Sequence, residues 1–457
     1  MHMTSKITTA FILATVLPAC SNSPGGTGAS ASQGSEDTAD ESPVTDASSS
    51  GGSSTSTTAA SNSADESDGS TAALDDDGND GPGVYYDLGL IPDTPSNGND
   101  CDDDKGGKGG GGGGDPDFSF IWVANSTEDT VSKIDTQSLE EVGRYRTREA
   151  PGGSPSRTSV NLNGDVAVAN RSGGVVKILA DIDQCPDQDN TSTGAGDVKP
   201  FPDGCVDWFT PLAYASNRPV AWTSGTFSGL TCRYENTKLW TSGANGSIDV
   251  LLLDGDSGEI EQTIPIPEAQ AGFYGIYGGA SDADGNFWGS QLSVGHLVFV
   301  DIDNFDHAVY PMPIGGYGMT VDEQGRPYTC AGGVARFDPD TATWQTNPNV
   351  GGGGGCMTDG EGTLWIGGYG GGGGNMIGID NETLDVVETI AIPQYVHGVS
   401  VDFYGYVWGV SMQQPFAYRV DPVAGTFDTF TGLTGPYTYS DMTGYALSNA
   451  SGLPPSG

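Results

Sequence analysis

His397 is the residue with the clearest potential for chemistry in this sequence. It lies in the segment YVHGVSVDFYGYVWGV, residues 395–410, directly before a short apolar run. Histidine exchanges a proton near neutral pH, so His397 is a candidate acid or base. The rest of the segment has a structural explanation, because two apolar runs joined by a turn at Asp402 and Gly405 predict a tight β-hairpin.

The same hairpin recurs at intervals of roughly 40 residues, the size of a four-stranded propeller blade. Its marker is an aspartate, a glycine three residues later and an aromatic residue three further on. The copies are Asp282, Gly285 and Trp288; Asp322, Gly325 and Tyr328; Asp359, Gly362 and Trp365; and Asp402, Gly405 and Trp408. A single hairpin is marginally stable, so repeated copies must stack to bury their apolar faces.

A second marker counts the blades. An apolar strand that ends in aspartate occurs seven times, at Asp135, Asp181, Asp254, Asp301, Asp338, Asp380 and Asp421. First strands number only six before the tail, and we expect the missing one in Tyr439 to Leu447. The sequence therefore predicts an all-β protein, a seven-bladed β-propeller closed by the C-terminal strand, which leaves no open sheet edge. A miscounted insertion would give six or eight blades instead.

The blade register identifies a candidate binding site. In a propeller the innermost strands line the central channel, and the turns that lead into them form one face where ligands usually bind. The positions equivalent to His397 are Ser156, Asn217, Tyr277, Tyr317, Gly354 and, from the tail, Ser440. Next to them, Arg157, Arg218 and Asp441 bring charge of both signs. This ring predicts a site for a small polar ligand or a partner protein. The alternative is that these residues merely fill and hydrate the channel.

One family shares the motif around His397. The repeat of the virginiamycin B lyase (streptogramin lyase) family resembles Val396-His397-Gly398-Val399 followed by Asp402, Gly405 and Val407-Trp408. The resemblance covers roughly residues 118–447. It implies a propeller fold and a lyase that cleaves an ester of a cyclic peptide by elimination. In the family, histidines on adjacent inner strands and a glutamate that holds magnesium carry the reaction, and His397 matches the last of these histidines.

The sequence departs from that catalytic set at two places. Gly354 occupies the equivalent position in the preceding blade, and the strand after His397 continues as Gly409-Val410-Ser411-Met412 without an acidic residue. An elimination needs a base and a group that stabilises the enolate. We therefore favour a binding or scaffold module, with a carbon-oxygen lyase acting on a cyclic peptide or polysaccharide as the alternative.

The N-terminal quarter predicts export. Residues 1–19 combine Lys6 with an apolar run, which is typical of a signal peptide. The following Cys20 completes Leu17-Pro18-Ala19-Cys20, which resembles a bacterial lipobox, so Cys20 is expected to be lipidated. The alternative is an ordinary cleaved signal with a structural cysteine. Ser21 resembles a sorting signal for the outer membrane of Gram-negative bacteria. The lipid would then anchor the protein in the cell envelope.

The domain boundaries follow from composition. Residues 20–117 are rich in Ser, Thr, Gly, Ala and Asp, with too few large apolar residues to fold, so we expect a disordered acidic tether. The propeller is expected over 118–447 and a disordered tail over 448–457. The net charge is −43 with only 17 Lys and Arg, which argues against a nucleic-acid partner.

The cysteines beyond Cys20 are even in number, which favours disulfides in an exported chain. Cys185 and Cys205 flank one loop, and Cys330 and Cys356 lie on consecutive repeats, so these are the expected pairs. Cys101 and Cys232 remain by elimination.

The insertion 181–205 carries alternating carboxylates. Asp183, Asp187 and Asp189 are spaced as in a calcium loop, although the glycine and the distal glutamate of an EF-hand are missing. Calcium is thus a candidate cofactor, and magnesium is expected only for a lyase. A disulfide at the base of the loop could hold it without metal.

Overall fold

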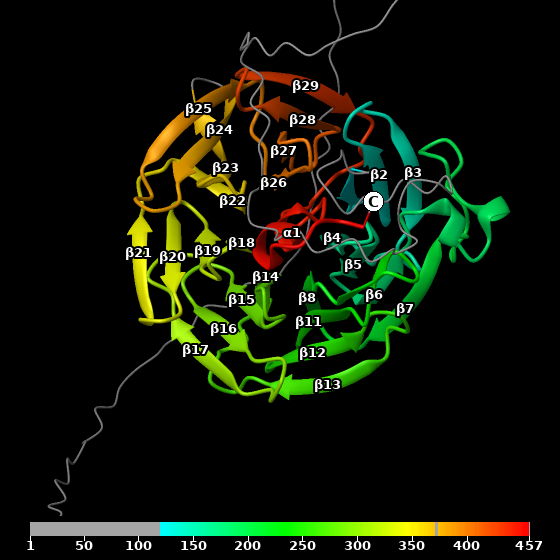
Figure 1. Cartoon of the computed structure of the whole chain (residues 1–457), viewed down its shortest axis with the longest axis horizontal. Coiled ribbons are helices and arrows are strands. Elements are labelled where there is room, and N and C mark those ends of the chain that lie inside the picture. The colour runs from blue at the N-terminus through cyan, green and yellow to red at the C-terminus, as the bar shows by residue number, and fades with distance from the viewer. Residues whose placement is uncertain (1–118, 371–372, 457) are drawn as a thin grey trace, which may run out of the picture. The chain divides into compact units, whose positions relative to one another are not determined.

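The computed structural model describes residues 119–370 and 373–456. The predicted signal peptide, the lipidation site Cys20 and the tether therefore lie outside the described residues. The described part of the chain is a ring of seven antiparallel sheets around a central axis, so the prediction of a seven-bladed β-propeller is confirmed (Figure 1). None of its helices is long and apolar enough to cross a membrane.

The first three blades carry both irregular features of the ring. Blade 1 has only three regular strands, and a separate two-stranded hairpin projects from blade 3. Blade 1 contains β1 (Phe120–Asn125), β2 (Thr130–Asp135) and β3 (Glu141–Arg146); blade 2 contains β4 (Pro155–Val160), β5 (Val166–Asn170), β6 (Gly173–Ile178) and β7 (Val206–Leu212); blade 3 contains β8 (Ser216–Trp222), β11 (Lys238–Ala244), β12 (Ile248–Asp254) and β13 (Ile260–Pro265), and the hairpin is β9 (Thr226–Ser228) with β10 (Arg233–Glu235).

The last four blades are regular four-stranded meanders. Their bounds are β14 (Ile276–Ser281), β15 (Phe287–Gln291), β16 (His296–Val300) and β17 (His307–Pro311) in blade 4; β18 (Gly318–Val321), β19 (Pro327–Cys330), β20 (Val334–Asp338) and β21 (Thr343–Asn347) in blade 5; β22 (Gly352–Thr358), β23 (Thr363–Gly370), β24 (Gly373–Asp380) and β25 (Val386–Ile392) in blade 6; and β26 (Gly398–Val401), β27 (Val407–Val410), β28 (Phe416–Asp421) and β29 (Thr426–Thr431) in blade 7.

The C-terminal segment closes the ring, but not as the expected regular strand. Pro436 forms an isolated bridge with Asn125 of β1, and the Tyr437 amide donates to the Ala124 carbonyl at 3.0 Å. Further along, the Trp122 amide donates to the Met442 carbonyl at 2.8 Å. Between these contacts the backbone leaves the strand register. The closure was predicted correctly, whereas a continuous strand over 439–447 was not.

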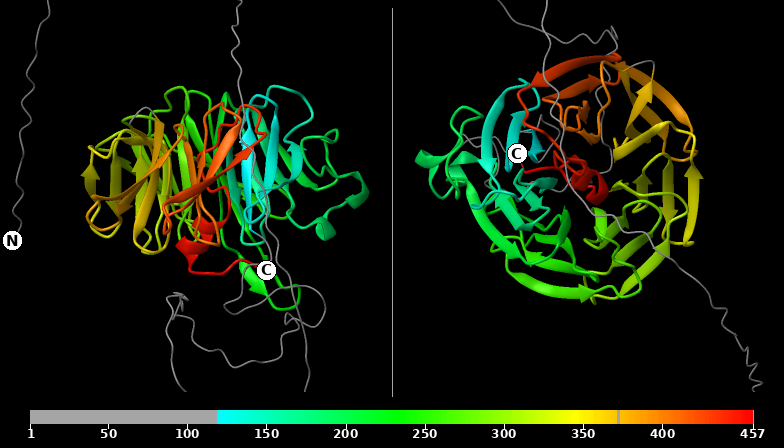
Figure 2. Two further views of the ribbon diagram at one scale, coloured as in Figure 1. Left: turned by 90° about the horizontal axis from the view of Figure 1, so that it is seen from above. Right: turned by 180° about the vertical axis from the view of Figure 1, so that it is seen from behind.

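A helix covers the first four residues of the predicted disordered tail, 448–457, together with the three residues before them. Helix α1 (Tyr445–Ser451) buries Leu447 and Ala450 and lies against one face of the ring, over the centre (Figure 2). The chain beyond it is also held, because the Ser456 amide donates to the Leu162 carbonyl at 2.7 Å. A few apolar contacts made to distant strands order this segment, and its composition alone does not reveal them.

The repeated aspartate has a structural role in each hairpin. In blade 7 the Oδ1 atom of Asp402 accepts the amides of Tyr404 and Tyr406, and its Oδ2 atom accepts Trp408 Nε1 at 2.8 Å. Asp282, Asp322 and Asp359 make the corresponding contacts with Trp288, Tyr328 and Trp365. The motif is therefore explained by folding, as the sequence indicated.

Both expected disulfides are present. Cys185–Cys205 closes the insertion, and Cys330–Cys356 joins β19 to β22 across two blades. Cys232 is also disulfide-bonded, and Cys101, the partner expected by elimination, lies outside the described residues. Disulfides are typical of proteins that mature in an oxidising compartment, which is consistent with export.

Candidate functional site

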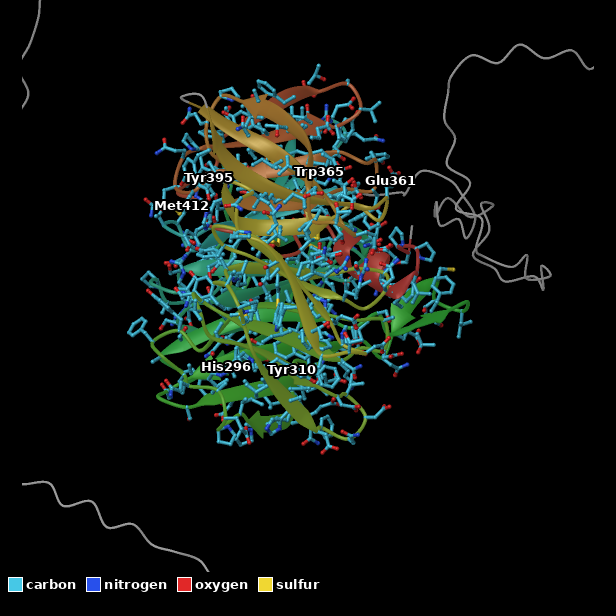
Figure 3. The ribbon with its side chains drawn as sticks, turned by 90° about the vertical axis from the view of Figure 1, so that its left-hand side faces the viewer. His296, Tyr310, Glu361, Trp365, Tyr395 and Met412 are labelled. Atoms are coloured by element: carbon cyan, nitrogen blue, oxygen red, sulfur yellow. A yellow bond between two sulfur atoms is a disulfide. The ribbon has the colours of Figure 1, made fainter. Side chains whose placement is uncertain are left out.

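The candidate site lies at the end of the channel opposite α1. The innermost strands begin at this end, and Figure 3 shows Tyr395 and Met412 on the side of the ring away from the helix, with Glu361 on the helix side. We call this end the channel mouth. Its central side chains, the mouth cluster, are Arg157, Arg171, Arg218, Tyr277, Tyr317, His397, Tyr437 and Tyr439.

The tyrosines of the mouth cluster contact one another. The Tyr277 hydroxyl lies 3.0 Å from the Tyr437 hydroxyl and 3.3 Å from that of Tyr317. The hydroxyls of Tyr317 and Tyr437 are also hydrogen-bonded. The rings of Tyr277 and Tyr439 are stacked with centroids 5.5 Å apart. These contacts bring side chains from β14, the turn before β18 and the C-terminal segment to one point on the axis.

Arg157 is the most buried cation of the mouth cluster. Its guanidinium carbon lies 3.0 Å from the centroid of the Tyr439 ring, and its Nη1 atom donates to the Tyr439 carbonyl at 3.2 Å. Its Nη2 atom donates to the Tyr317 carbonyl at 3.4 Å. Burial holds the pKa of Arg157 well below its usual value, and repulsion from Arg218 and Arg171 adds to the effect.

His397 is buried with one ring nitrogen engaged. Its Nδ1 atom lies 2.9 Å from the Tyr395 hydroxyl, which itself donates to the Gly353 carbonyl at 2.9 Å. The Tyr395 oxygen therefore accepts a hydrogen bond from Nδ1–H, which leaves Nε2 as the acceptor nitrogen, without a partner among the described residues. Burial, aided by Arg157, lowers the pKa of His397 to about 4, so the imidazole is neutral at pH 7.

The other predicted positions on β4, β8 and β22 line the buried wall of the same end. The Asn217 Nδ2 atom donates to Thr241 Oγ1 at 3.2 Å and to the Ser242 carbonyl at 2.9 Å, whereas Ser156 Oγ and Asn217 Oδ1 have no partner in the described chain. Gly354 has φ +103, and a Cβ there would lie 2.6 Å from the His397 carbonyl oxygen. No side chain fits at that position, which explains the missing second histidine.

Ser440 and Asp441 lie deeper than predicted. Ser440 Oγ accepts the Thr158 amide at 3.2 Å, and the Asp441 carboxylate accepts the amides of Thr443 and Gly444 at the α1 end. Burial raises the pKa of Asp441 to about 6. The irregular backbone after Pro436 displaces the register, because it inserts extra residues before Met442.

Sequence reasoning missed Tyr437, Tyr439 and Arg171 as members of the mouth cluster. The tail supplies the two tyrosines in place of Ser440 and Asp441, and Arg171 follows β5, with its guanidinium carbon 4.3 Å from the Tyr437 ring centroid. The alternation Tyr437-Thr438-Tyr439 was an available signal, since it places both rings on one side of an extended segment.

The insertion does not gather its carboxylates. Asp183 and Asp189 lie in 3₁₀ turns at Ile182–Gln184 and Gln188–Asn190, and Asp187 precedes the second turn. Within residues 119–370 and 373–456, no three His, Cys, Asp or Glu side chains are arranged to hold a metal ion. Calcium therefore stays a prediction, and no carboxylate beside His397 fits the magnesium site of the resembled family.

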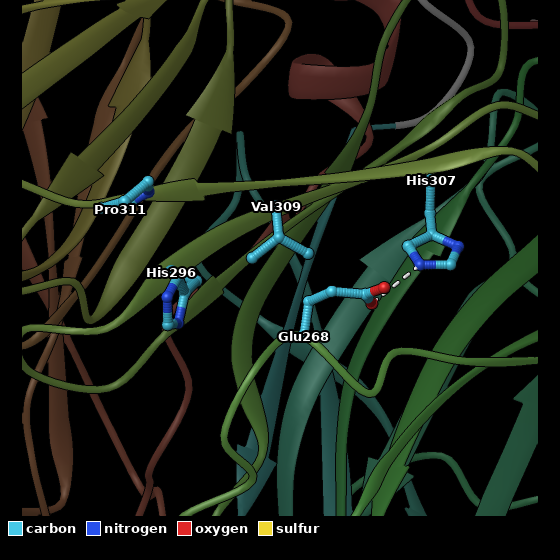
Figure 4. A pocket seen from close by; sticks show the side chains of 5 residues that line it. All are labelled: Glu268, His296, His307, Val309 and Pro311. Atoms are coloured by element: carbon cyan, nitrogen blue, oxygen red, sulfur yellow. Dashed lines mark hydrogen bonds and ion pairs between the residues drawn. The ribbon is translucent and has the colours of Figure 1, made fainter. Parts of the chain in front are cut away.

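A groove away from the mouth lies at the outer edge of blade 4. This groove of about 280 Å³ is lined by Glu268, His296, His307, Val309 and Pro311 (Figure 4). His307 Nε2 lies 3.0 Å from Glu268 Oε2, whereas His296 Nδ1 lies 3.1 Å from Gln291 Oε1. The two histidines thus have separate partners on opposite sides of Val309, at the starts of β16 and β17.

Similarity to known proteins was found among solved structures. No protein family model matches the sequence, and no curated protein matches it. Among solved structures, a streptogramin B lyase is similar at 14% identity and TM-score 0.45, covering 64% of this chain and 89% of that chain. Virginiamycin B lyase from Staphylococcus aureus gives 14% identity and TM-score 0.45, with 63% and 88% covered. A putative 6-phosphogluconolactonase from Bacteroides fragilis gives 13% and 0.46, with 70% and 97% covered. At these identities the likeness is one of fold alone, and it is shared by structures with different names.

Proposed function

We propose that this protein is an exported lipoprotein of the cell envelope whose propeller binds a small polar ligand at the channel mouth. The supporting observation is a set of buried polar atoms that have no hydrogen-bond partner in the described chain: Ser156 Oγ, Arg157 Nε, Asn217 Oδ1, Arg218 Nε, His397 Nε2 and Tyr439 Oη. Buried polar groups are normally hydrogen-bonded, because an unpaired one costs roughly 1–3 kcal/mol. A ligand with several polar groups would satisfy them.

The position of these atoms favours a specific ligand over general surface adhesion. They come from β4, β8, the turn before β26 and the C-terminal segment, so they converge on the axis from blades far apart in sequence. Cationic, aromatic and neutral polar groups that converge in this way can fix the orientation of a ligand.

The binding role is tested with the full chain and a panel of neutral, anionic and cationic small molecules. We expect at least one class to raise the melting temperature, because a ligand bound only by the folded state stabilises it. Arg218→Gln should abolish the rise, whereas the matched change Arg146→Gln, at an exposed position on β3, should preserve it. A panel in which no compound acts, or acts equally on Arg218→Gln, contradicts the proposal.

A lyase is the second candidate, favoured by the free Nε2 atom of His397 and the hydrogen bond with Tyr395 that orients the ring. A pKa near 4 makes this imidazole a weak base. The test is new ultraviolet absorbance from an unsaturated product when the full chain meets a cyclic peptide ester, with and without magnesium. Activity that His397→Ala abolishes would replace the binding role. Absence of product would leave binding as the function.

Anchoring is tested separately. Cys20→Ala should release the protein from membranes if Cys20 carries the lipid. A variant that still sediments with the outer membrane would contradict lipid anchoring without affecting the role of the channel mouth.

A further inference from the structure

We propose that the ligand of the channel mouth is a ring-containing carboxylate, held by the guanidinium groups of Arg171 and Arg218 and by the aromatic faces of Tyr274 and Tyr277. This inference rests on the binding role proposed above and adds the chemical class of the ligand. It follows from the charge, the hydrogen bonding and the aromatic surface of the mouth.

The charge of the mouth is uncompensated. Arg157, Arg171 and Arg218 form no ion pair with any carboxylate of the described residues, whereas Arg144, Arg233, Arg326 and Arg419 each do. Among the described residues Arg146 and Arg148 also lack a carboxylate partner, but they are exposed or half-buried, whereas Arg157 and Arg218 are buried. A buried charge is costly unless it is paired, so an anion from outside the chain is the missing partner.

The two outer arginines retain donors for that anion. The Nη1 atom of Arg218 donates to Ser216 Oγ at 2.9 Å, and the Nη1 atom of Arg171 donates to Ser154 Oγ at 2.9 Å. The Nε atom of each is buried without a partner in the described chain, and neither Nη2 atom donates a hydrogen bond within it. A guanidinium presents its N–H groups as a planar fork that matches the two oxygens of a carboxylate. The serine contacts hold the forks in place for such a contact.

The aromatic surface beside the arginines extends from solvent to the axis. Phe273 is 75% exposed and Tyr274 is 37% exposed, and their rings meet edge to face at 4.8 Å. Tyr274 in turn lies 5.6 Å from the buried Tyr277, and the Arg218 guanidinium lies 5.0 Å and 4.8 Å from these two rings. Aromatic faces favour contact with flat, weakly polar rings, so the organic part of the ligand is expected to be cyclic.

The experiment compares three probes on the full chain by calorimetric titration and thermal shift. Benzoate carries the ring and the carboxylate, benzamide is its neutral isostere, and inorganic sulfate is an anion without a ring. We expect benzoate to bind about tenfold more tightly than either of the others. Arg171→Gln and Arg218→Gln should each weaken benzoate about tenfold, Arg171→Lys should weaken it less, and Arg146→Gln should change it by less than about twofold. Circular dichroism and the unfolding midpoint verify that each variant is folded.

Each other outcome overturns a defined part of the inference. If benzamide and benzoate bind with equal affinity, the ligand does not need a carboxylate. If sulfate and benzoate bind with equal affinity through the same arginines, the ligand does not need a ring. No binding of benzoate up to its solubility overturns both the carboxylate and the ring. If neutral or cationic compounds still act through Arg218 and Tyr277, the channel mouth remains a binding site and only the ligand class is wrong. If no compound acts at the mouth, the proposed function itself fails.

Discussion

The charged side chains at the two ends of the channel differ in whether the chain itself supplies their partners. At the α1 end, Asp402 and Asp441 each accept two or more backbone amides, so their carboxylates are used by the fold. At the mouth, Arg157 donates to two carbonyls, but it and its neighbours Arg171 and Arg218 face no carboxylate. The acids of the α1 end are hydrogen-bonded within this chain, whereas the cations of the mouth have no carboxylate partner among the described residues, and the binding proposal rests on this difference.

The largest expected effect is at the α1 end. Asp402→Ala leaves the Trp408 indole N–H and the amides of Tyr404 and Tyr406 without their acceptor, so we expect a loss of about 4 kcal/mol in unfolding free energy. Chemical denaturation measures it. Asp402→Asn should recover part of the loss, and Asp284→Ala, in an exposed turn, should change stability by less than about 0.5 kcal/mol. A loss for Asp402→Ala as small as that of the control would mean that the hairpin does not need its carboxylate.

His397 should give the mouth its own pH dependence. Its pKa falls from 6.5 to about 4 in the folded state, so the unfolded chain takes up the proton first as the pH falls. Unfolding free energy should therefore decrease by up to about 3 kcal/mol between pH 6.5 and pH 4, and His397→Gln should remove this decrease.

The acids of the α1 end act in the opposite direction over part of this range. Burial raises the pKa of Asp402 and of Asp441 to about 6, so the folded state takes up these protons first, and their protonation increases the unfolding free energy as the pH falls from 6 toward 4. Asp402 and Asp441 are present in both the wild type and His397→Gln. The difference in unfolding free energy between the two proteins therefore measures the contribution of His397. Parallel stability curves for the two proteins would show that His397 is not buried in its neutral form.

Removing an unpaired cation from the mouth should stabilise the fold. Arg218→Met eliminates repulsion with Arg171 and Arg157 and keeps most of the side-chain volume, so we expect a gain of about 1 kcal/mol together with loss of ligand binding. The matched variant Arg233→Met should instead lose about 1 kcal/mol, because Arg233 pairs with the buried Asp165 at 3.2 Å. Equal losses in both would indicate that Arg218 already has a partner within the chain.

The smallest effect concerns the orientation of His397. Tyr395→Phe removes one hydrogen bond, worth about 1 kcal/mol, and frees Nδ1. Nitrogen NMR of labelled protein should show the Nδ1–H tautomer in the wild type and a mixture in the variant. A wild-type signal from the Nε2–H tautomer would contradict the relay from His397 through Tyr395 to Gly353.

The repeated hairpin motif makes most of the fold predictable from the sequence. The aspartate, glycine and aromatic positions of the hairpin are fixed by local hydrogen bonds, so their spacing predicts the blades, and the seven strands that end in aspartate predict their number. The C-terminal closure was found by counting, but the irregular backbone between Pro436 and Met442 follows from contacts with β1 that no local pattern encodes. Helix α1 was missed for the same reason.

The candidate site was predicted as far as the repeat register reaches. Arg157, Arg218, Tyr277, Tyr317 and His397 meet at the mouth because equivalent positions of inner strands meet on the axis of a ring. Ser440 and Asp441 were placed there wrongly, since the tail departs from the register. The absence of carboxylate partners for the arginines depends on which blades face one another, and only the three-dimensional arrangement reveals it.

The closure of blade 1 also sets the order in which the molecule can form. The Thr434 amide donates to Asn125 Oδ1 across 309 residues of chain, and the same C-terminal stretch supplies Tyr437 and Tyr439 to the mouth. Contacts between such distant residues form slowly, because a long loop must close before they contribute. A growing chain therefore has neither a closed ring nor a complete mouth until its last residues have arrived. If the mouth binds a ligand as proposed, a copy that ends before Tyr437 should not bind it, and binding would then report that the C-terminal segment is in place.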